Sequence, residues 1–324
     1  MNPKGRELNK EQVQKIADSD YKVPEGIDPE ALIPELIELL GSTDQMTRER
    51  SFEILDVWGE AGRFSDEALR SLGQQMADNL ACGLGDVESD SVFLRAYSAL
   101  VLCTPVCVDQ LFAAGLVDGR APFLSPEQVR NWCDRAVESL RGENDLRGFI
   151  AGKGWADAVS HMGDTLCQLA RSPHTRVSEL EQILEAIADR LTRPTDTVFV
   201  MDEGSRLMKA VYHVLLRGEL PLDTLKEWIK GFSLTSDGKT WGWKGIYSLE
   251  FCDYRAVNAR LNVCEALRSL YFLLKLGMRR RHSLEQAKNE YYAFYERPIR
   301  YRDELMEAIV SVQRSMYDWL YPKK

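Results

Sequence analysis

The sequence has none of the short motifs that mark the common nucleotide-binding and hydrolytic enzymes. It contains no G-x-x-x-x-G-K-[ST] loop, no G-x-S-x-G turn, no H-E-x-x-H pair and no G-x-G-x-x-G after a candidate strand. Histidine is also scarce, with four in 324 residues. The familiar phosphate-binding and hydrolase chemistries are therefore without support.

An excess of positive charge is missing as well. Lys and Arg number 41 against 50 Asp and Glu, which gives a net charge of -9 at pH 7. A chain of this charge repels polyanions in bulk, so non-specific binding to nucleic acid or to an anionic membrane is disfavoured. We therefore expect a partner that is neither a nucleic acid nor a membrane.

Long apolar runs are few. The first 21 residues are polar and lack the apolar core of a secretory signal. The most apolar stretch, residues 97–108, contains Pro105 and is too short to span a bilayer, so it predicts a buried helix. The seven cysteines form no C-x-x-C pair, which favours reduced and mostly buried thiols. These features predict a cytoplasmic protein with no cofactor.

Helical signals recur along the chain, whereas alternating β-branched runs are nearly absent. Asp28 and Pro29 offer an N-cap and a first-turn proline, and Ser125 with Gln128 forms a capping-box pattern. The best strand candidate, residues 196–201, is short and flanked by helical patterns. The sequence therefore predicts an all-α fold.

A weak internal repeat organises the first two thirds of the chain. Residues 33–62 resemble residues 77–105: each segment has an apolar helix, a polar turn and a second helix that starts near Arg48 or Arg95. The same plan is followed more loosely by residues 133–170 and 180–216. Two helices in roughly 40 to 47 residues are typical of HEAT and armadillo repeats, which stack because one hairpin cannot bury its apolar stripe alone. We predict an irregular HEAT/armadillo-like stack of helical hairpins, an α-α superhelix.

The composition also predicts where the parts of the chain begin and end. We expect an N-terminal helix and linker over 1–27, HEAT-like hairpins over 28–232, a loop rich in Gly and Trp over 233–248, and a C-terminal helical cap over 249–324 that packs on the same domain. The cap should hold a long helix over 255–276 and aromatic-rich helices around Tyr291 and Tyr317. Such a cap would cover the apolar face of the last repeat.

One stretch of the third hairpin carries a possible site. Gly152 and Gly154 predict a flexible turn, and a helix should begin near Trp155. Asp157, His161 and Asp164 would then lie along one stripe of that helix. Three interpretations stay open. The stripe could bind a divalent metal, a carboxylate could orient His161 as a general base, or the stripe could be structural, with Arg147 pairing with one of the acids.

These residues resemble an uncharacterised bacterial helical family, catalogued as domain of unknown function 2785. The resemblance covers roughly residues 33–276 and implies a helical-repeat fold without an established activity. The family usually has a histidine where this sequence has Asp157, which argues against a paired-histidine metal site. The residues that carry the resemblance are Arg147-Gly148, Gly154-Trp155-Ala156, His161 and Asp164, and then Phe251 to Asn258 with Leu270 to Phe272.

In stacked hairpins the second helices usually line a concave face, and we expect a binding groove there. The predicted function is to hold a peptide, a protein segment or a polar small ligand in this groove. The alternative is an enzyme that uses the Asp/His/Asp stripe for acid-base or metal chemistry. The ligand-binding candidates are Arg147, Trp155, Asp157, His161, Asp164, Tyr254, Arg255 and Asn258. Further expected groove residues are Asp56, Trp58, Arg95, Tyr97, Glu203 and Arg206.

Overall fold

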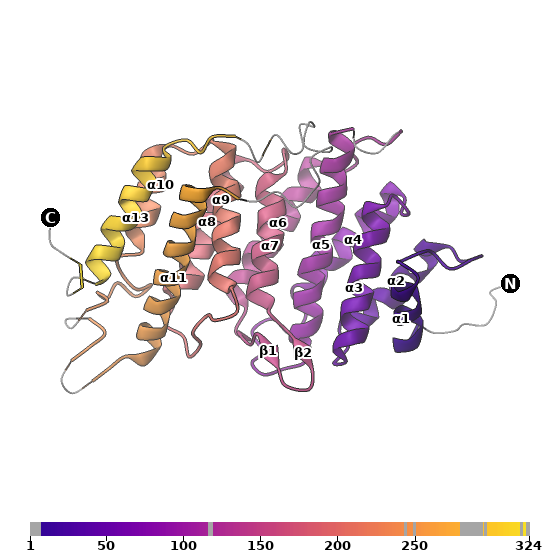
Figure 1. Cartoon of the computed structure of the whole chain (residues 1–324), viewed down its shortest axis with the longest axis horizontal. Helices are drawn as coiled ribbons and strands as arrows, with labels where there is room; N and C mark the ends of the chain where they lie inside the picture. The colour runs from indigo at the N-terminus through magenta and orange to yellow at the C-terminus, as the bar shows by residue number, and fades with distance from the viewer. Residues whose placement is uncertain are drawn as a thin grey trace. The chain divides into compact units, whose positions relative to one another are not determined.

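The structure is a computed structural model that describes residues 8–115, 119–242, 245–248, 251–278, 294, 297–317 and 320–321. Helices dominate these residues, and one short β-hairpin is the only sheet among them (Figure 1). The predicted all-α class is therefore confirmed. The chain forms two compact units, Met1–His174 and Thr175–Lys324.

The first unit holds helices α1 to α7 and the hairpin. In chain order the elements are α1 (Lys10–Asp18), the 3-10 helix η1 (Pro29–Leu32), α2 (Ile33–Leu39), α3 (Gln45–Glu60), α4 (Asp66–Asn79), α5 (Ser91–Ala113), α6 (Pro126–Gly142), β1 (Phe149–Ile150), β2 (Gly154–Trp155) and α7 (Ala158–Arg171). Helices α3, α5 and α7 pack side by side, and α4 and α6 pack on each other in a second layer (Figure 1). The helices α3, α5 and α7 each begin inside the matching segment of the sequence repeat, whereas only the last three residues of α4 lie inside segment 77–105.

Helix α5 is the core of this unit. It runs from Ser91 to Ala113, so it extends well beyond the apolar stretch 97–108, and its side chains are buried along most of that length. It is the one helix in the described part of the chain that is long and apolar enough to cross a membrane, but 72% of its most apolar window is buried inside the protein. The helix is apolar on all sides because other helices surround it.

An aspartate stands at the N-cap of each of α3, α5, α7, α9 and α11. These residues are Asp44, Asp90, Asp157, Asp202 and Asp253. Aspartate suits this position because its carboxylate can accept the unpaired N–H groups of a first turn. The side chains of Asp44 and Asp253 do so, with Thr47 N (2.9 Å) and Ala256 N (3.1 Å) as donors.

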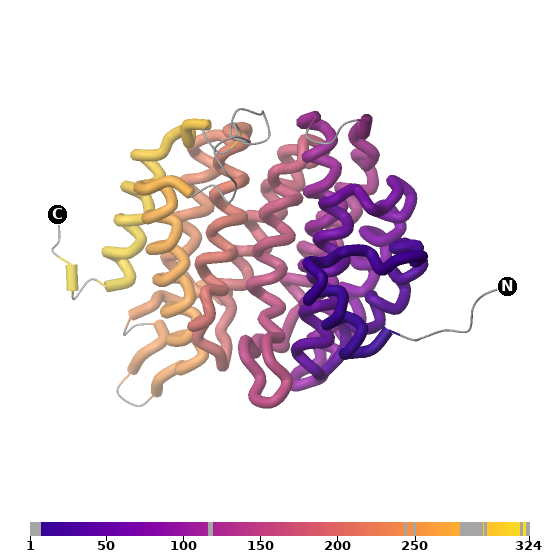
Figure 2. Tube along the Cα trace, turned by 45° about the vertical axis from the view of Figure 1, so that its right-hand side comes forward, coloured from indigo at the N-terminus to yellow at the C-terminus, as the bar shows by residue number. Residues whose placement is uncertain are grey.

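The start of α7 differs from the prediction. The predicted turn is present at residues 151–153, but it joins β1 and β2 into a hairpin (Figure 2). The helix begins at Ala158, three residues after Trp155. Asp157 has a left-handed backbone with φ 53° and therefore lies outside the helix. Two backbone bonds extend the hairpin pairing past β2, from Ala156 N to Gly148 O (2.8 Å) and from Asp157 N to Arg147 O (3.1 Å).

The second unit contains the remaining described helices. They are α8 (Val177–Thr192), α9 (Glu203–Arg217), α10 (Leu222–Gly231), α11 (Tyr254–Leu276) and α13 (Arg302–Met316). Helix α11 packs on α8, α9 and α13, and α10 packs on α8 and α13. The predicted long helix over 255–276 is therefore present as α11. The aromatic segment around Tyr291 lies outside the described residues, apart from Phe294.

The strand candidate at residues 196–201 is not a strand. Its backbone lies along α11, where the Asn262 amide accepts a hydrogen bond from Phe199 N (2.7 Å) and donates one to Thr197 O (3.1 Å). A side chain therefore satisfies the polar groups that a second strand would satisfy in a sheet.

The contacts divide the chain between His174 and Thr175, inside the predicted stack 28–232. The predicted third hairpin belongs to the first unit and the fourth, α8/α9, to the second. The boundaries expected at residues 27, 232 and 248 stay predictions. Trp241, in the predicted Gly/Trp loop, is buried and donates a hydrogen bond to Phe232 O (2.9 Å).

Candidate functional site

His161 is the central residue of the predicted stripe, and it is buried between α5 and α7. Only 7% of its surface is exposed. Its Nδ1 lies 3.2 Å from Ala96 O, and its ring meets the Tyr97 ring edge to face at 5.4 Å. A carbonyl oxygen only accepts, so a hydrogen bond at this contact requires a proton on Nδ1. The ring could act as a base only toward a group that reaches this buried place.

Asp157 and Asp164 occupy different environments. Asp157 is 8% exposed, and its Oδ1 accepts a hydrogen bond from the Ser160 hydroxyl at 2.6 Å, in the first turn of α7. Asp164 is half-buried one turn after His161, three residues on, so these two share a helix face. Asp157 is thus the N-cap residue of the helix on which the other two residues lie.

Cys103 on α5 is close enough to Asp164 to feel its charge. Burial raises the pKa of Cys103 well above its usual value, and the charges of Asp164 and Asp56 raise it further. A thiol of this kind is protonated at neutral pH and is a poor nucleophile. Among the described residues, no three His, Cys, Asp or Glu side chains are grouped closely enough to hold a metal ion.

Arg147 pairs with a different acid from the one expected. Its guanidinium donates to both oxygens of Asp145, Nε to Oδ1 at 2.7 Å and Nη2 to Oδ2 at 2.5 Å, and Nη2 also donates to Ser89 O at 3.1 Å. Arg147 therefore joins the loop after α6 to the loop before α5.

Arg48 is fully buried, and the sequence alone did not predict its burial or its partners. From α3 it donates to the carbonyl oxygens of Lys153 (2.8 Å) and Trp155 (2.9 Å), which lie in the hairpin, and to Ser42 O (2.5 Å). Its guanidinium also lies 4.0 Å from the centre of the Phe93 ring. Trp155, a predicted ligand-binding residue, is thus tied to α3 through its backbone.

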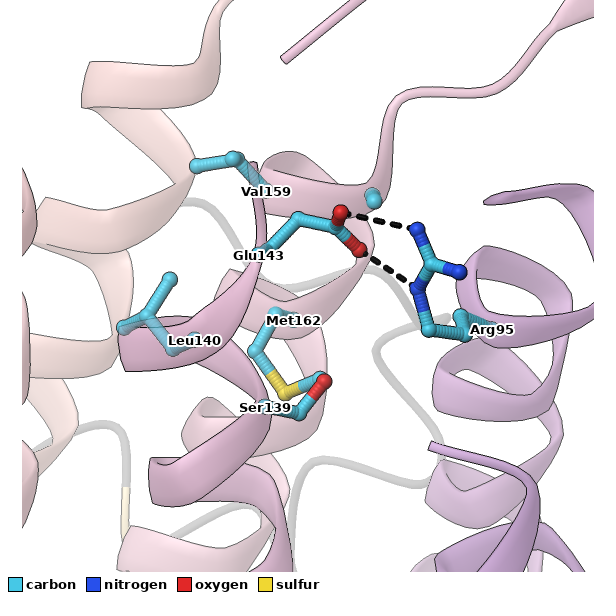
Figure 3. A pocket seen from close by; sticks show the side chains of 7 residues that line it. Arg95, Ser139, Leu140, Glu143, Val159 and Met162 are labelled. Carbon is cyan, nitrogen blue, oxygen red and sulfur yellow. Dashed lines mark hydrogen bonds and ion pairs between the residues drawn. The ribbon is translucent and has the colours of Figure 1, made fainter. Parts of the chain in front are cut away.

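Arg95, on α5, is the residue that the sequence comparison aligned with Arg48. It forms a two-point ion pair with Glu143, with Nε and Nη2 each 2.8 Å from a carboxylate oxygen (Figure 3). Its Nη1 donates to Cys82 O, Gly83 O and Ser91 Oγ, each at 2.8 Å. Beside this pair is a cavity of about 10 Å³, lined by Arg95, Ser139, Leu140, Glu143, Ala158, Val159 and Met162. A space of that size holds at most one water molecule.

The repeat alignment placed Arg48 and Arg95 near the start of a second helix, but it did not predict that their side chains are buried. Three of the residues expected to line a groove, Trp58, Arg95 and Tyr97, are all buried. Burial raises the pKa of Tyr97 to about 12, against the opposing effect of the Arg48 charge. These three residues therefore pack inside the first unit and do not line an open groove, which corrects the expectation for them.

The other three ligand-binding candidates lie on α11 in the second unit, where they contact Thr195 and Asp196, in the segment before α9. Tyr254 OH donates to Asp196 Oδ1 (2.5 Å), and Arg255 Nε lies 3.3 Å from Asp196 Oδ2. Asn258 Nδ2 donates to Thr195 O (3.1 Å). The structure thus brings these candidates together around residues 195–196, while the other five lie in the first unit.

A groove of ligand-binding size lies elsewhere in the first unit. It lies between η1 and α2 on one side and α4 on the other, is open to solvent and has a volume of about 450 Å³. Its lining residues are Glu30, Ile33, Pro34, Ile37, Ala68, Ser71, Leu72 and Gln75. Pockets of roughly 300 to 1,000 Å³ with an apolar lining and a few polar groups are typical binding sites. The sequence held no signal for this groove, because its residues read only as the apolar stripes of two helices.

Comparison with known proteins gives a family but no activity. The family model described as "Protein of unknown function (DUF2785)" matches residues 80–272, more than half of the chain. That range includes Arg147 to Asp164 and the segment from Phe251 to Asn258. No curated protein and no solved structure matches the chain. The protein belongs to the DUF2785 family of proteins of unknown function.

Proposed function

We propose that this protein is a cytoplasmic helical-repeat binding protein and that its helix pairs are HEAT-like repeats. Support for the repeats comes from the order α3, α5, α7 in the first unit, in which each helix packs on the next. Arg48 and Arg95 add to it, because each donates to the turn before its own helix and to a segment that follows α6. Repeat proteins of this type act by binding other molecules along their helices.

The observation that carries the binding function is the groove between η1, α2 and α4. Its volume of about 450 Å³ suits a protein segment, and its lining repeats at helical spacing, with Ile33 and Ile37 on one wall and Ala68 and Leu72 on the other. An amphipathic helix of a partner protein fits such a groove, since its apolar face can lie between the two walls.

The charges around the groove indicate the polar face of that partner helix. Residues 29–39, which form η1 and α2, contain three glutamates and neither Lys nor Arg. The first turn of α4 also holds Asp66 and Glu67, but Arg120 pairs with Asp66, so the acidic charge at the groove comes mainly from the three glutamates. The basic residue on that turn, Arg70, lies 3.1 Å from Glu67 and donates to Phe123 O. A helix with Lys or Arg beside its apolar face is therefore the complementary partner.

The enzyme alternative has weaker support. Asp157 and His161 are more than nine-tenths buried, and the contacts described for them lie within α7 or with α5. A catalytic base needs a substrate within hydrogen-bond reach. The geometry of these residues therefore favours a structural role.

Binding can be tested with two pools of helical peptides that share one apolar face, one with a basic polar face and one with an acidic polar face. Fluorescence polarisation with the full chain should detect members of the basic pool and no comparable binding from the acidic pool. Ser71→Trp fills the groove from an exposed position and should weaken binding by about tenfold or more.

Ser178→Trp is the matched control, because Ser178 is an exposed helical serine on α8, in the second unit. It should leave the affinity unchanged. Equal binding of both pools, no binding of either, or equal effects of the two tryptophans would each contradict the groove as the binding site.

A further inference from the structure

Helix α11 presents an exposed stripe that mixes apolar and charged side chains. Its residues are Leu261, Glu265, Arg268, Phe272 and Leu276, spaced by four, three, four and four positions, so they share one helix face. Leu261 is 39%, Phe272 58% and Leu276 78% exposed. The opposite face of α11 packs on α8, α9 and α13 (Figure 1).

Three large apolar residues on one exposed face are unusual for a helix that already buries its other face. Single exposed leucines need no explanation, whereas apolar residues in register along a helix mark a contact surface. Two charges lie between them: Glu265 and Arg268 face each other at 3.5 Å, and their side chains are 59% and 48% exposed. The stripe therefore has an apolar residue on each side of a central charge pair.

The order of these residues makes the stripe complementary to itself. Two antiparallel copies of α11, related by a two-fold axis midway between positions 266 and 267, place Glu265 opposite Arg268 of the second copy. The same symmetry places Leu261 opposite Phe272 and the half-buried Val257 opposite Leu276. Each pair occurs twice, as in any two-fold interface.

We propose that this stripe is a dimerisation surface and that its partner is a second copy of the same chain, bound through antiparallel α11 helices. The contact can extend along the 23 residues of α11, a length of about 35 Å. Two ion pairs at its centre fix the register, and the apolar pairs on either side supply buried area. The inference concerns a different unit and a different partner from the α2/α4 groove, so it does not rest on the proposed function.

The charge order provides a test by charge exchange in the full chain. Sedimentation velocity over a range of concentrations should show a dimer for the wild-type protein. Glu265→Arg and Arg268→Glu each place like charges opposite one another, and each should raise the dimer dissociation constant by about tenfold or more. The double variant E265R/R268E restores opposite charges across the axis and should return the constant to within about threefold of the wild-type value.

Glu227→Arg is the matched control, because Glu227 is an exposed glutamate on α10 and lies off the stripe. It should leave the dissociation constant unchanged, and far-UV circular dichroism should show the same helix content for every variant. A wild-type protein that stays monomeric at about 100 µM, where a weak specific dimer would form, overturns the proposal. Single reversals that leave the dimer intact, or a double variant that does not recover, also overturn it.

Discussion

Arg48 and Arg95 show how single buried charges hold this fold together. A buried guanidinium is costly unless its donors are satisfied, and Arg95 meets that need with a carboxylate, two carbonyls and a hydroxyl. Arg48 meets it in part: its Nη atoms donate to backbone carbonyls and its guanidinium lies over an aromatic ring, while its Nε is buried without an acceptor among the described residues. Both residues connect segments that are far apart in the sequence.

Removal of the Arg95 charge should be among the more damaging substitutions in the chain. Arg95→Met leaves the buried carboxylate of Glu143 without its ion-pair partner, and we expect the free energy of unfolding to fall by about 3 to 5 kcal/mol. Urea unfolding followed by circular dichroism measures this change. The double variant R95M/E143L should lose less than the single one, and Arg302→Ala, which removes an exposed pair with Asp303, should change stability by less than about 0.5 kcal/mol.

Asp44 should make stability depend on pH in the acid range. A hydrogen bond from Lys10, with that from the Thr47 backbone, lowers the pKa of Asp44 from 3.8 to about 2. Because the folded pKa is the lower one, the stabilisation is fully present above about pH 4 and is lost as the pH falls toward about 2. Asp44→Ala should therefore cost about 1 kcal/mol near neutral pH and progressively less below about pH 4. A stability difference that stays constant down to about pH 3 would contradict this assignment.

At the scale of elements, the β1/β2 hairpin is held tightly against α3. Gly154 has φ 84°, and a Cβ at this position would meet the side chain of Gln45. Arg48 binds two carbonyls of the same hairpin. The hairpin therefore depends on a glycine for both its backbone conformation and its close approach to the helix.

Gly154→Ala tests these two causes separately. The strained backbone should cost about 1 to 3 kcal/mol, and the contact with Gln45 should add to this loss. Shortening Gln45 in the double variant Q45A/G154A should recover the steric part and leave the backbone part. Thermal unfolding of both variants and of Gln45→Ala alone measures the two contributions. Complete recovery in the double variant would show that the backbone at residue 154 is unstrained.

At the scale of the whole molecule, the burial of α5 bears on whether the chain needs detergent to stay in solution. Its apolar composition resembles that of a membrane span, but the other helices of the first unit cover most of it. We expect the full chain to be recovered in the soluble fraction of cells broken without detergent. Recovery only after detergent is added would contradict the interpretation of α5 as a core helix.

The helices were predictable because their signals are local. The capping box at Ser125 and the apolar periodicity of residues 33–62 are examples. Each signal involves residues that lie within one or two helical turns of each other. The same local patterns placed α11 correctly and failed at α7, where a hairpin and a left-handed Asp157 delay the helix. The hairpin makes contacts with α3, which a local pattern does not contain.

The sequence by itself determined the all-α class and the family to which the chain belongs. Tertiary structure alone decided which polar residues are buried, because Arg48 meets its carbonyl partners more than a hundred positions away. It also decided that His161 faces α5, that Tyr254 and Asn258 hold residues 195–196, and that a groove opens between α2 and α4. Helix periodicity identifies the side that is buried, whereas the burial of each residue depends on which element packs against it.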